Sequence, residues 1–172
     1  EKLPNGTTNL VTAAFVLNEV GDSALEGAVD RLWDATGDML IVVEPGTPDA
    51  WQRMMRVRSR LLQSGAHLVG PCPHTHPCPI VAPDWCHFSE RVNRLRIHRQ
   101  LKNAQLAYED EKFTWLAFSR RAVEPAVSRI LRHPEVHSGW IRLSLCTREG
   151  LQSRTVSRKE SSAWKRVRNT SM

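Results

Sequence analysis

Several patterns are missing from this 172-residue sequence, and each absence excludes a class of protein. No apolar run approaches the ~20 residues of a membrane-spanning helix, and no basic-apolar-small leader opens the chain, so we expect no membrane span and no signal peptide. No GxGxG-like turn precedes a helix, which argues against a nucleotide-cofactor turn within this sequence. No P-loop and no Ser/His/Asp arrangement stand out, which disfavours nucleoside triphosphatases and hydrolases.

A CxxC pair is also missing, although the sequence contains four cysteines. Cys72, Cys78 and Cys86 fall within fifteen residues of a segment rich in proline and histidine, and Cys146 closes a later apolar run. The gaps between them are five, seven and fifty-nine residues. Thiolates select zinc or iron–sulfur clusters, and zinc ribbons usually present close ligand pairs, whereas clusters accept looser spacing. The spacing therefore favours an iron–sulfur cluster, with zinc as the alternative and unrelated thiols or disulfides as a third interpretation.

Four histidines accompany these cysteines and keep a mixed Cys/His zinc site open, or serve as donors to sulfur: His67, His74, His76 and His87. Among the six tryptophans, Trp85 lies beside Cys86, where it could shield a cluster or stack on a base, and we expect the others in the core. The clustering of thiols without a leader favours a reducing compartment.

Acidic residues are scarce in two basic stretches of this chain, whose formal net charge is +6. Residues 91–102 contain five basic residues and no acid. Residues 142–172 contain eight basic residues against Glu149 and Glu160, namely Arg142, Arg148, Arg154, Arg158, Lys159, Lys165, Arg166 and Arg168. Such stretches suit the phosphates of a nucleic acid, although a solvated face has the same composition.

Hydrophobic periodicity predicts alternating strands and helices, hence an α/β fold with a mostly parallel sheet. We expect strands at 9–17, 39–43, 66–69, 112–119 and 140–146, and the last two could pair at one edge. Helices are expected at 25–33, capped by Ser23, at 48–62, capped by Thr47, and at 88–101, with a helical or turn segment at 126–131. The arginines of the second helix are expected on a wet face: Arg53, Arg56, Arg58 and Arg60.

One main domain is expected over residues 1–160, with a cysteine-rich loop at 70–90 that inserts between strands. The polar sequence from Gln152 onward, and the basic tail at 161–172 in particular, is expected to be loosely ordered.

Six short strings make the sequence similar to the methyltransferase-like family of mitochondrial small-ribosomal-subunit assembly proteins and their bacterial relatives. They lie at 15–19 (FVLNE), 43–48 (VEPGTP), 65–74 (GAHLVGPCPH), 77–79 (PCP), 84–89 (DWCHFS) and 108–113 (YEDEKF). The resemblance covers about residues 9–158, and the fuller strings at 84–88 and 108–113 favour the bacterial branch. It implies the cytoplasm for a bacterial source or the mitochondrial matrix for a eukaryotic one.

The resemblance implies a class I, Rossmann-like fold dependent on S-adenosylmethionine, association with small-subunit ribosomal RNA, and a role in ribosome assembly and translation. It implies a 4Fe-4S cluster on Cys72, Cys78, Cys86 and Cys146, and neither DNA nor membrane partners. A non-catalytic RNA-binding assembly factor and a structural-zinc RNA-binding module are the alternatives.

The sequence departs from that family at its front, because the Gly-rich cofactor turn is absent. What starts at Asn9 resembles the fourth strand of the fold, so we interpret the chain as the C-terminal half of the methyltransferase sheet, with S-adenosylmethionine bound in a longer parent. No catalytic residue is identified. Asn18 and Glu19, after the first strand, are candidates for facing the cofactor or substrate, and Glu44 is a further candidate. The first strand would leave an apolar edge, which predicts poor solubility in isolation.

Overall fold

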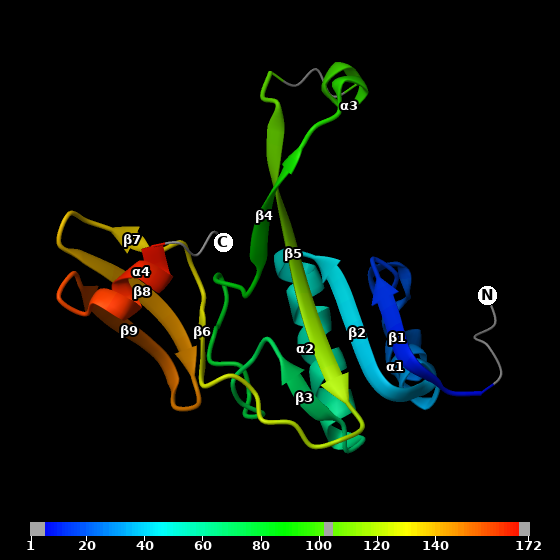
Figure 1. The fold of residues 1–172 in the computed structure, drawn as a ribbon. Helices are drawn as coiled ribbons and strands as arrows, with labels where there is room; N and C mark the ends of the chain where they lie inside the picture. The colour runs from blue at the N-terminus through cyan, green and yellow to red at the C-terminus, as the bar shows by residue number, and fades with distance from the viewer. Residues whose placement is uncertain (1–5, 102–104, 169–172) are drawn as a thin grey trace.

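The computed structural model describes residues 6–101 and 105–168, which form two β-sheets with helices packed on them (Figure 1). The first sheet has the order β1-β2-β5-β3, and β4 extends it by pairing with β5. Its strands are β1 (Thr8–Ala14), β2 (Thr36–Pro45), β3 (His67–Gly70), β4 (Phe88–Asn93) and β5 (Tyr108–Ser119). Helices α1 (Leu25–Asp34) and α2 (Pro48–Gln63) pack on one face, and two short 3-10 turns, η1 (Leu17–Glu19) and η2 (Asp22–Ala24), link β1 to α1.

The α/β class is confirmed, but the mostly parallel sheet is wrong. Only β1 and β2 pair in parallel among the described strands, and β5 runs antiparallel to β2, β3 and β4. Because β5 opposes both β2 and β3, the strands β1, β2 and β3 all point the same way. The reversal arises because β4 and β5 pair with each other as antiparallel neighbours, and a parallel neighbour would require a crossover connection.

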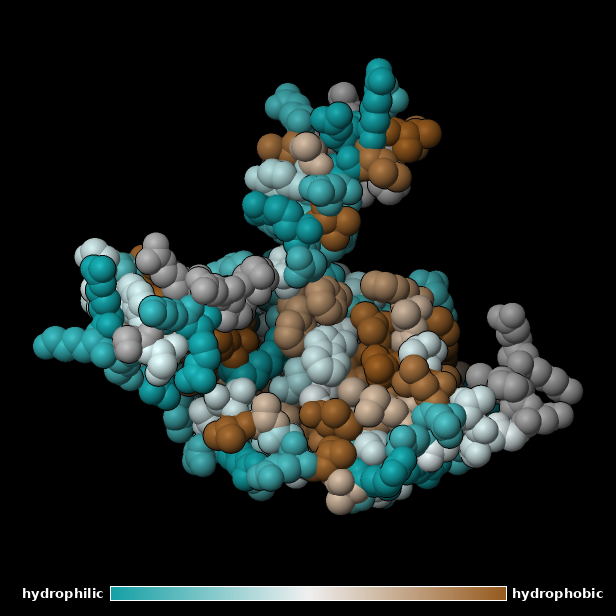
Figure 2. Space-filling model, in the orientation of Figure 1, coloured by the Kyte–Doolittle hydropathy of each residue, from teal (hydrophilic) through white to brown (hydrophobic). Residues whose placement is uncertain are grey.

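The main core lies between the sheet and the helices. Alternation along β2 turns Leu40 and Val42 toward α1 and α2, where both are fully buried. Phe118 of β5 joins them, and its side chain is also fully buried. The opposite face of the sheet carries Ile41 and other half-buried apolar residues, and Figure 2 shows a broad hydrophobic surface there. No described helix covers that face.

The start of α2 follows the sequence prediction. The Thr47 hydroxyl accepts a hydrogen bond from the Ala50 N–H, and Pro48 occupies the first helical turn. The cap predicted for α1 is wrong, because the helix begins after Ala24 and has no side-chain cap. The prediction that the arginines of α2 lie on a solvent-exposed face is wrong for Arg58, which is only 3% exposed.

The helix expected at 88–101 is wrong in its first half. Residues 88–93 form β4, and only Arg96–Leu101 form a helix, α3. The strand forms because Phe88 pairs across to Phe113 and stacks on its ring at 5.5 Å, which is a long-range contact invisible to local periodicity. The resulting hairpin carries α3 as an arm that projects from the body (Figure 1). Lys102 of the first basic stretch lies outside the described residues.

The second sheet and its helix correct three further expectations. It consists of β6 (Ser128–Ile130), β7 (Glu135–Val136), β8 (Trp140–Thr147) and β9 (Gly150–Ser157), with β6, β7 and β9 all paired to β8. The segment at 126–131 therefore contains the strand β6 and no helix, and β8 does not pair with β5. The tail is not loosely ordered over Ser161–Arg168, which form α4, because Trp164 is buried against Ile141 and Val156.

Candidate metal centre

The cysteines come from two places in the fold. Cys72, Cys78 and Cys86 lie in the irregular segment 71–87 between β3 and β4, and Cys146 lies near the end of β8 in the second sheet. Cys146 is buried, and the other three are partly buried. The segment thus links β3 to β4 within the first sheet and contacts the second sheet through the pairs Cys86–Arg129 and His74–Cys146. The prediction that Cys146 closes a strand is confirmed.

The four thiols are close enough to perturb one another. Burial, followed by the neighbouring Cys72, Cys78 and Cys86, raises the pKa of Cys146 to about 11. Burial is also the main cause of the raised pKa values of Cys72 and Cys78, with Cys86 adding to each. Among the residues that the structure describes, however, no group of three or more His, Cys, Asp or Glu side chains is arranged to hold a metal ion. The thiols share one region without forming a ligand cage.

Two arginines lie among these thiols. Arg58 of α2 donates to the His74 carbonyl at 2.7 Å and to the His76 carbonyl at 2.9 Å. Arg129 of β6 donates from Nη1 to the Cys86 sulfur at 2.6 Å and from Nη2 to the His87 carbonyl at 3.0 Å. Both guanidinium groups lower the pKa values of Cys72 and Cys78, against the larger effect of burial. Two positive charges therefore lie close enough to the sulfurs to affect their ionisation.

Sequence reasoning missed both arginines, and for Arg58 a signal existed. Arg58 lies four residues after Met54 and three before Leu61, and both of these are buried. Residues so spaced share one face of a helix, so the position belongs to the buried stripe. Arg129 is missed because its contact with Cys86 depends on how the second sheet packs.

Of the four histidines, only His74 contacts a cysteine sulfur within the described chain. Its Nε2 lies 3.5 Å from the Cys146 sulfur, and burial followed by the Arg58 charge lowers its pKa. His76 stacks on it at 5.9 Å but is exposed. His67 is exposed on β3, and His87 faces the Trp85 carbonyl at 3.3 Å. Burial, followed by the Lys112 charge, also lowers the pKa of His87.

Trp85 fixes the cysteine segment to the first sheet. Its indole N–H donates to the Gly46 carbonyl at 2.9 Å, just after β2, and its ring packs against His87 at 5.1 Å. The Gly46 N–H in turn donates to the Lys112 carbonyl of β5 at 2.9 Å. The end of β2, the strand β5 and the cysteine segment thus meet at one glycine.

The donor set is chemically suited to a soft metal. Four thiols share one partly dry region, and thiolate sulfur is the ligand type that zinc and iron–sulfur clusters select. Metal binding deprotonates such thiols, so their raised pKa values do not prevent coordination. The adjacent guanidinium groups favour the thiolate form.

The candidate cofactor residues lie elsewhere, around η1. Asn18 and Glu19 are exposed at the carboxyl end of β1. Glu44 is 2% exposed, and its carboxylate accepts the backbone N–H groups of Val16, Leu17 and Asn18. Burial raises the pKa of Glu44, and these three hydrogen bonds oppose the rise. Glu44 therefore caps η1, whereas the side chains of Asn18 and Glu19 are exposed to solvent.

Many cations of the basic stretches already have acidic partners. Arg91 pairs with Asp110, Arg94 with Glu109, Arg142 with Glu135, Arg148 with Glu124 and Arg154 with Glu160. Within the described residues, the cations of these stretches left without an ion pair are Arg96, Arg99, Arg158, Lys159 and Lys165. The free positive charge is thus at α3 on the arm and at the end of the second sheet.

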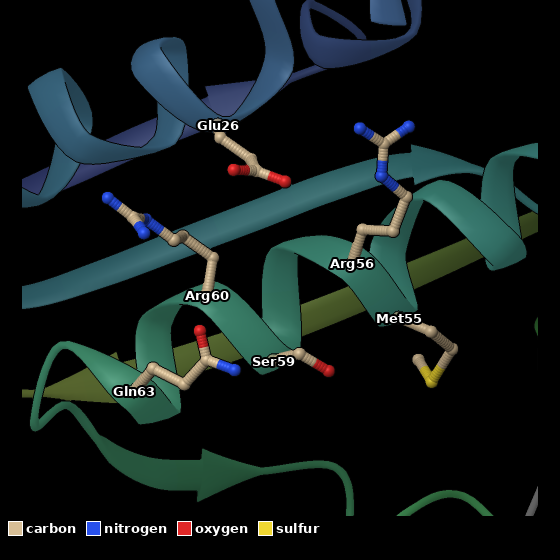
Figure 3. Close-up of a pocket in the computed structure, with 6 residues that line it drawn as sticks. All are labelled: Glu26, Met55, Arg56, Ser59, Arg60 and Gln63. Carbon is tan, nitrogen blue, oxygen red and sulfur yellow. The ribbon is translucent and has the colours of Figure 1, made fainter. Parts of the chain in front are cut away.

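Two hollows flank these elements. A cavity of about 520 Å³ opens beside the cysteine segment, between the base of the arm and β6, with Phe88, Lys112, Arg129 and Arg132 in its lining. Another, of about 330 Å³, lies on the outer side of α1 and α2. Figure 3 shows the Glu26 carboxylate of this second hollow between the guanidinium groups of Arg56 and Arg60. The cysteine segment contributes no residue to the second hollow.

Comparison with known proteins agrees with the resemblance indicated by the six short strings of the sequence. No helix in the described part of the chain is long and apolar enough to cross a membrane. The human protein named "Ribosome assembly protein METTL17, mitochondrial" is 28% identical, over 72% of this chain and 28% of its own length. The chain thus spans less than a third of that relative, and a mitochondrial relative gives no support to the expected bacterial source. The profile of the family described as "Mitochondrial small ribosomal subunit Rsm22" matches residues 2–172, so the chain belongs to the Rsm22 family.

Proposed function

We propose that this chain is the metal-binding part of a protein that assists assembly of the small ribosomal subunit by binding its RNA. Membership of the Rsm22 family and the name of the human relative support the assembly role. The observation that carries the metal proposal is the gathering of Cys72, Cys78, Cys86 and Cys146 in one region, from segments that lie far apart in sequence.

The proposed occupant is a 4Fe-4S cluster held by these four cysteines, with structural zinc as the alternative. Wide ligand spacing and the absence of a CxxC pair favour the cluster. When bound, the metal group supplies cross-links between thiolates, which would tie the segment 71–87 to β8. The cross-linked segment would then hold a binding surface in place, because the arm and the second sheet both border this segment.

We further propose that residues 1–160 form the C-terminal part of a Rossmann-like methyltransferase sheet, with the cysteine-rich loop at 70–90 as its insertion. Four strands of common direction (β1, β2, β3 and β4) with one antiparallel strand among them are compatible with that fold. The uncovered apolar face and the unpaired side of β1 support an additional layer in a longer protein.

For methyl transfer, the proposed S-adenosylmethionine site belongs to that longer protein, with Asn18 and Glu19 facing the cofactor or substrate. The non-catalytic role is favoured for this chain, because Glu44 is occupied as a cap and no Gly-rich turn is present in the sequence. Titration of the longer protein with S-adenosylmethionine separates these functions, and the absence of binding would exclude the enzyme.

The RNA surface is proposed to comprise α3 on the arm, the end of the second sheet and the cavity between them. Unpaired cations supply phosphate contacts, and the Phe113 ring beside the cavity offers a stacking surface for an unpaired base. RNA is expected to bind more tightly than a DNA duplex of equal length, because single-stranded loops present such bases.

A salt titration of binding to small-subunit ribosomal RNA tests this surface. Replacing Arg96 and Arg99 by Gln should weaken binding and flatten the salt dependence by roughly 0.7–0.9 per lost phosphate contact. Replacing Arg158 and Lys159 by Gln should act in the same way. The control is Arg121→Gln, since Arg121 is already paired with Asp38 and lies on neither surface. Equal slopes for all variants would exclude the proposed surface.

A further inference from the structure

Arg58 is a buried cation without an acidic partner. Its residue is 3% exposed, and its hydrogen bonds go only to the carbonyls of His74 and His76. Its Nε is buried and makes no hydrogen bond, and none of the described carboxylates forms an ion pair with it. An uncompensated buried charge is costly, so an anionic group is expected close to this guanidinium.

Arg129, which contacts the cysteine segment from β6, also lacks an ion-pair partner among the described residues. Its hydrogen bonds go to the Cys86 sulfur and the His87 carbonyl, and its guanidinium lies 3.6 Å from the centre of the Phe88 ring. Its Nε is also buried without a partner, and no described acid pairs with it. Two cations from different elements, α2 and β6, therefore lie near the thiols, and neither has an ion-pair partner among the described residues.

The charge of a four-thiolate metal centre matches this deficit. Four thiolates carry four negative charges, and a divalent ion or a cluster core of charge +2 leaves a net charge of −2. Two guanidinium groups cancel it. Four neutral thiols, or two disulfides, would leave both cations without a counter-charge, so the arginines discriminate among the interpretations of the cysteines.

We propose that Arg58 and Arg129 are the charge-neutralising pair of the metal centre, Arg129 by a hydrogen bond to the Cys86 sulfur and Arg58 by holding the segment that carries Cys72 and Cys78. This inference rests on the proposed metal function. Both arginines act through the ligands and touch no substrate. Their removal should weaken metal binding as the loss of other residues that support metal ligands does, by roughly 10–100-fold.

The test uses Co²⁺ as a coloured probe of tetrahedral thiolate coordination in the reduced protein. Each proton released by a thiol goes to the buffer, so the pH is held constant between variants. We expect Arg58→Met and Arg129→Met to raise the Co²⁺ dissociation constant by roughly 10–100-fold. The matched control is Arg60→Met, because Arg60 lies on the same helix but pairs with Asp30 at the surface, and its constant should be unchanged.

Arg58→Lys and Arg129→Lys retain the positive charge but lose the forked donor geometry. We expect them to bind Co²⁺ more tightly than the Met variants, and metal-free unfolding curves establish that each variant is folded. Met variants that bind like the wild type, or Lys variants that fail as badly as Met variants, would overturn the charge argument while leaving the metal centre intact. A wild-type chain that binds neither Co²⁺ nor iron would refute the metal centre and this inference together.

Discussion

Gly46 is the position where one added methyl group should do the most damage near the candidate site. A Cβ at this residue would lie 2.6 Å from the carbonyl carbon of Lys112 and from the nitrogen of Phe113, and 2.7 Å from the Lys112 Cβ. Two of these contacts are with backbone of the neighbouring strand, which cannot rotate away. Gly46→Ala must therefore separate the end of β2 from β5.

The expected cost follows from three terms. Overpacking against a rigid neighbour costs roughly 1–3 kcal/mol. Weakening the hydrogen bonds from Gly46 to Lys112 and from Trp85 to Gly46 adds about 1 kcal/mol. The lower entropy of alanine in the unfolded chain offsets roughly 0.4–1 kcal/mol. We therefore expect Gly46→Ala to lower the free energy of unfolding by about 2–3 kcal/mol.

Urea unfolding followed by tryptophan fluorescence measures this change, because Trp85 itself anchors at Gly46. The matched control is Gly139→Ala, since a Cβ at Gly139 meets nothing within 4 Å. We also expect the Gly46 variant to lose metal faster, as its cysteine segment is loosened. A Gly46→Ala protein that is as stable as the Gly139→Ala protein would refute the close approach of β2 and β5.

Three smaller perturbations check other parts of the structure. Thr47→Ala should destabilise the protein by about 1 kcal/mol through loss of the α2 cap, whereas Ser23→Ala should leave stability unchanged, and equal effects in urea unfolding would contradict the cap assignment. The hydrogen bond from Arg60 lowers the pKa of Asp30, so the pair stabilises the fold above the ordinary aspartate pKa of about 3.9, and this contribution is lost as the pH falls through the lowered value. Asp30→Asn should therefore flatten the fall of stability below pH ~4, and an unchanged acid limb would contradict it. The isolated chain should self-associate through its uncovered sheet. The substitution Leu10→Lys on β1 should reduce this self-association, as measured by size-exclusion chromatography. A wild-type protein that is monodisperse and melts cooperatively would contradict the exposed edge.

Local sequence patterns predicted the elements whose conformation is determined mainly by their own residues. The strand at β2, the helix α2 and its Thr47 cap follow from periodicity and from the position of Pro48. The strand β8 was also predicted, but β4 and the partners of β8 in the small sheet, β6, β7 and β9, could not be found in this way. The side chains of β9 are mostly exposed and polar, so its strand form depends on pairing with β8 across the turn before Gly150, whose φ is +115°.

In the candidate site, too, some residues could be identified from the sequence and others only from the tertiary structure. The four cysteines were identified from composition and spacing, and the structure places Cys146 beside His74 although they are far apart in sequence. The cations among them were not identified. Arg58 resembles any surface arginine until its neighbours Met54 and Leu61 are read as a buried stripe, and Arg129 reaches Cys86 only through tertiary packing.

Metal and sulfide analysis of anaerobically purified protein, combined with its visible spectrum, tests the central claim most directly. We predict a brown protein with a broad absorbance near ~400 nm, about four irons per chain, and loss of the colour on Cys→Ser at any one of the four cysteines. Serine variants that remain folded by unfolding assays give the matched comparison. A colourless wild-type protein that holds one zinc ion would contradict the cluster, and one that holds no metal at all would contradict the centre itself.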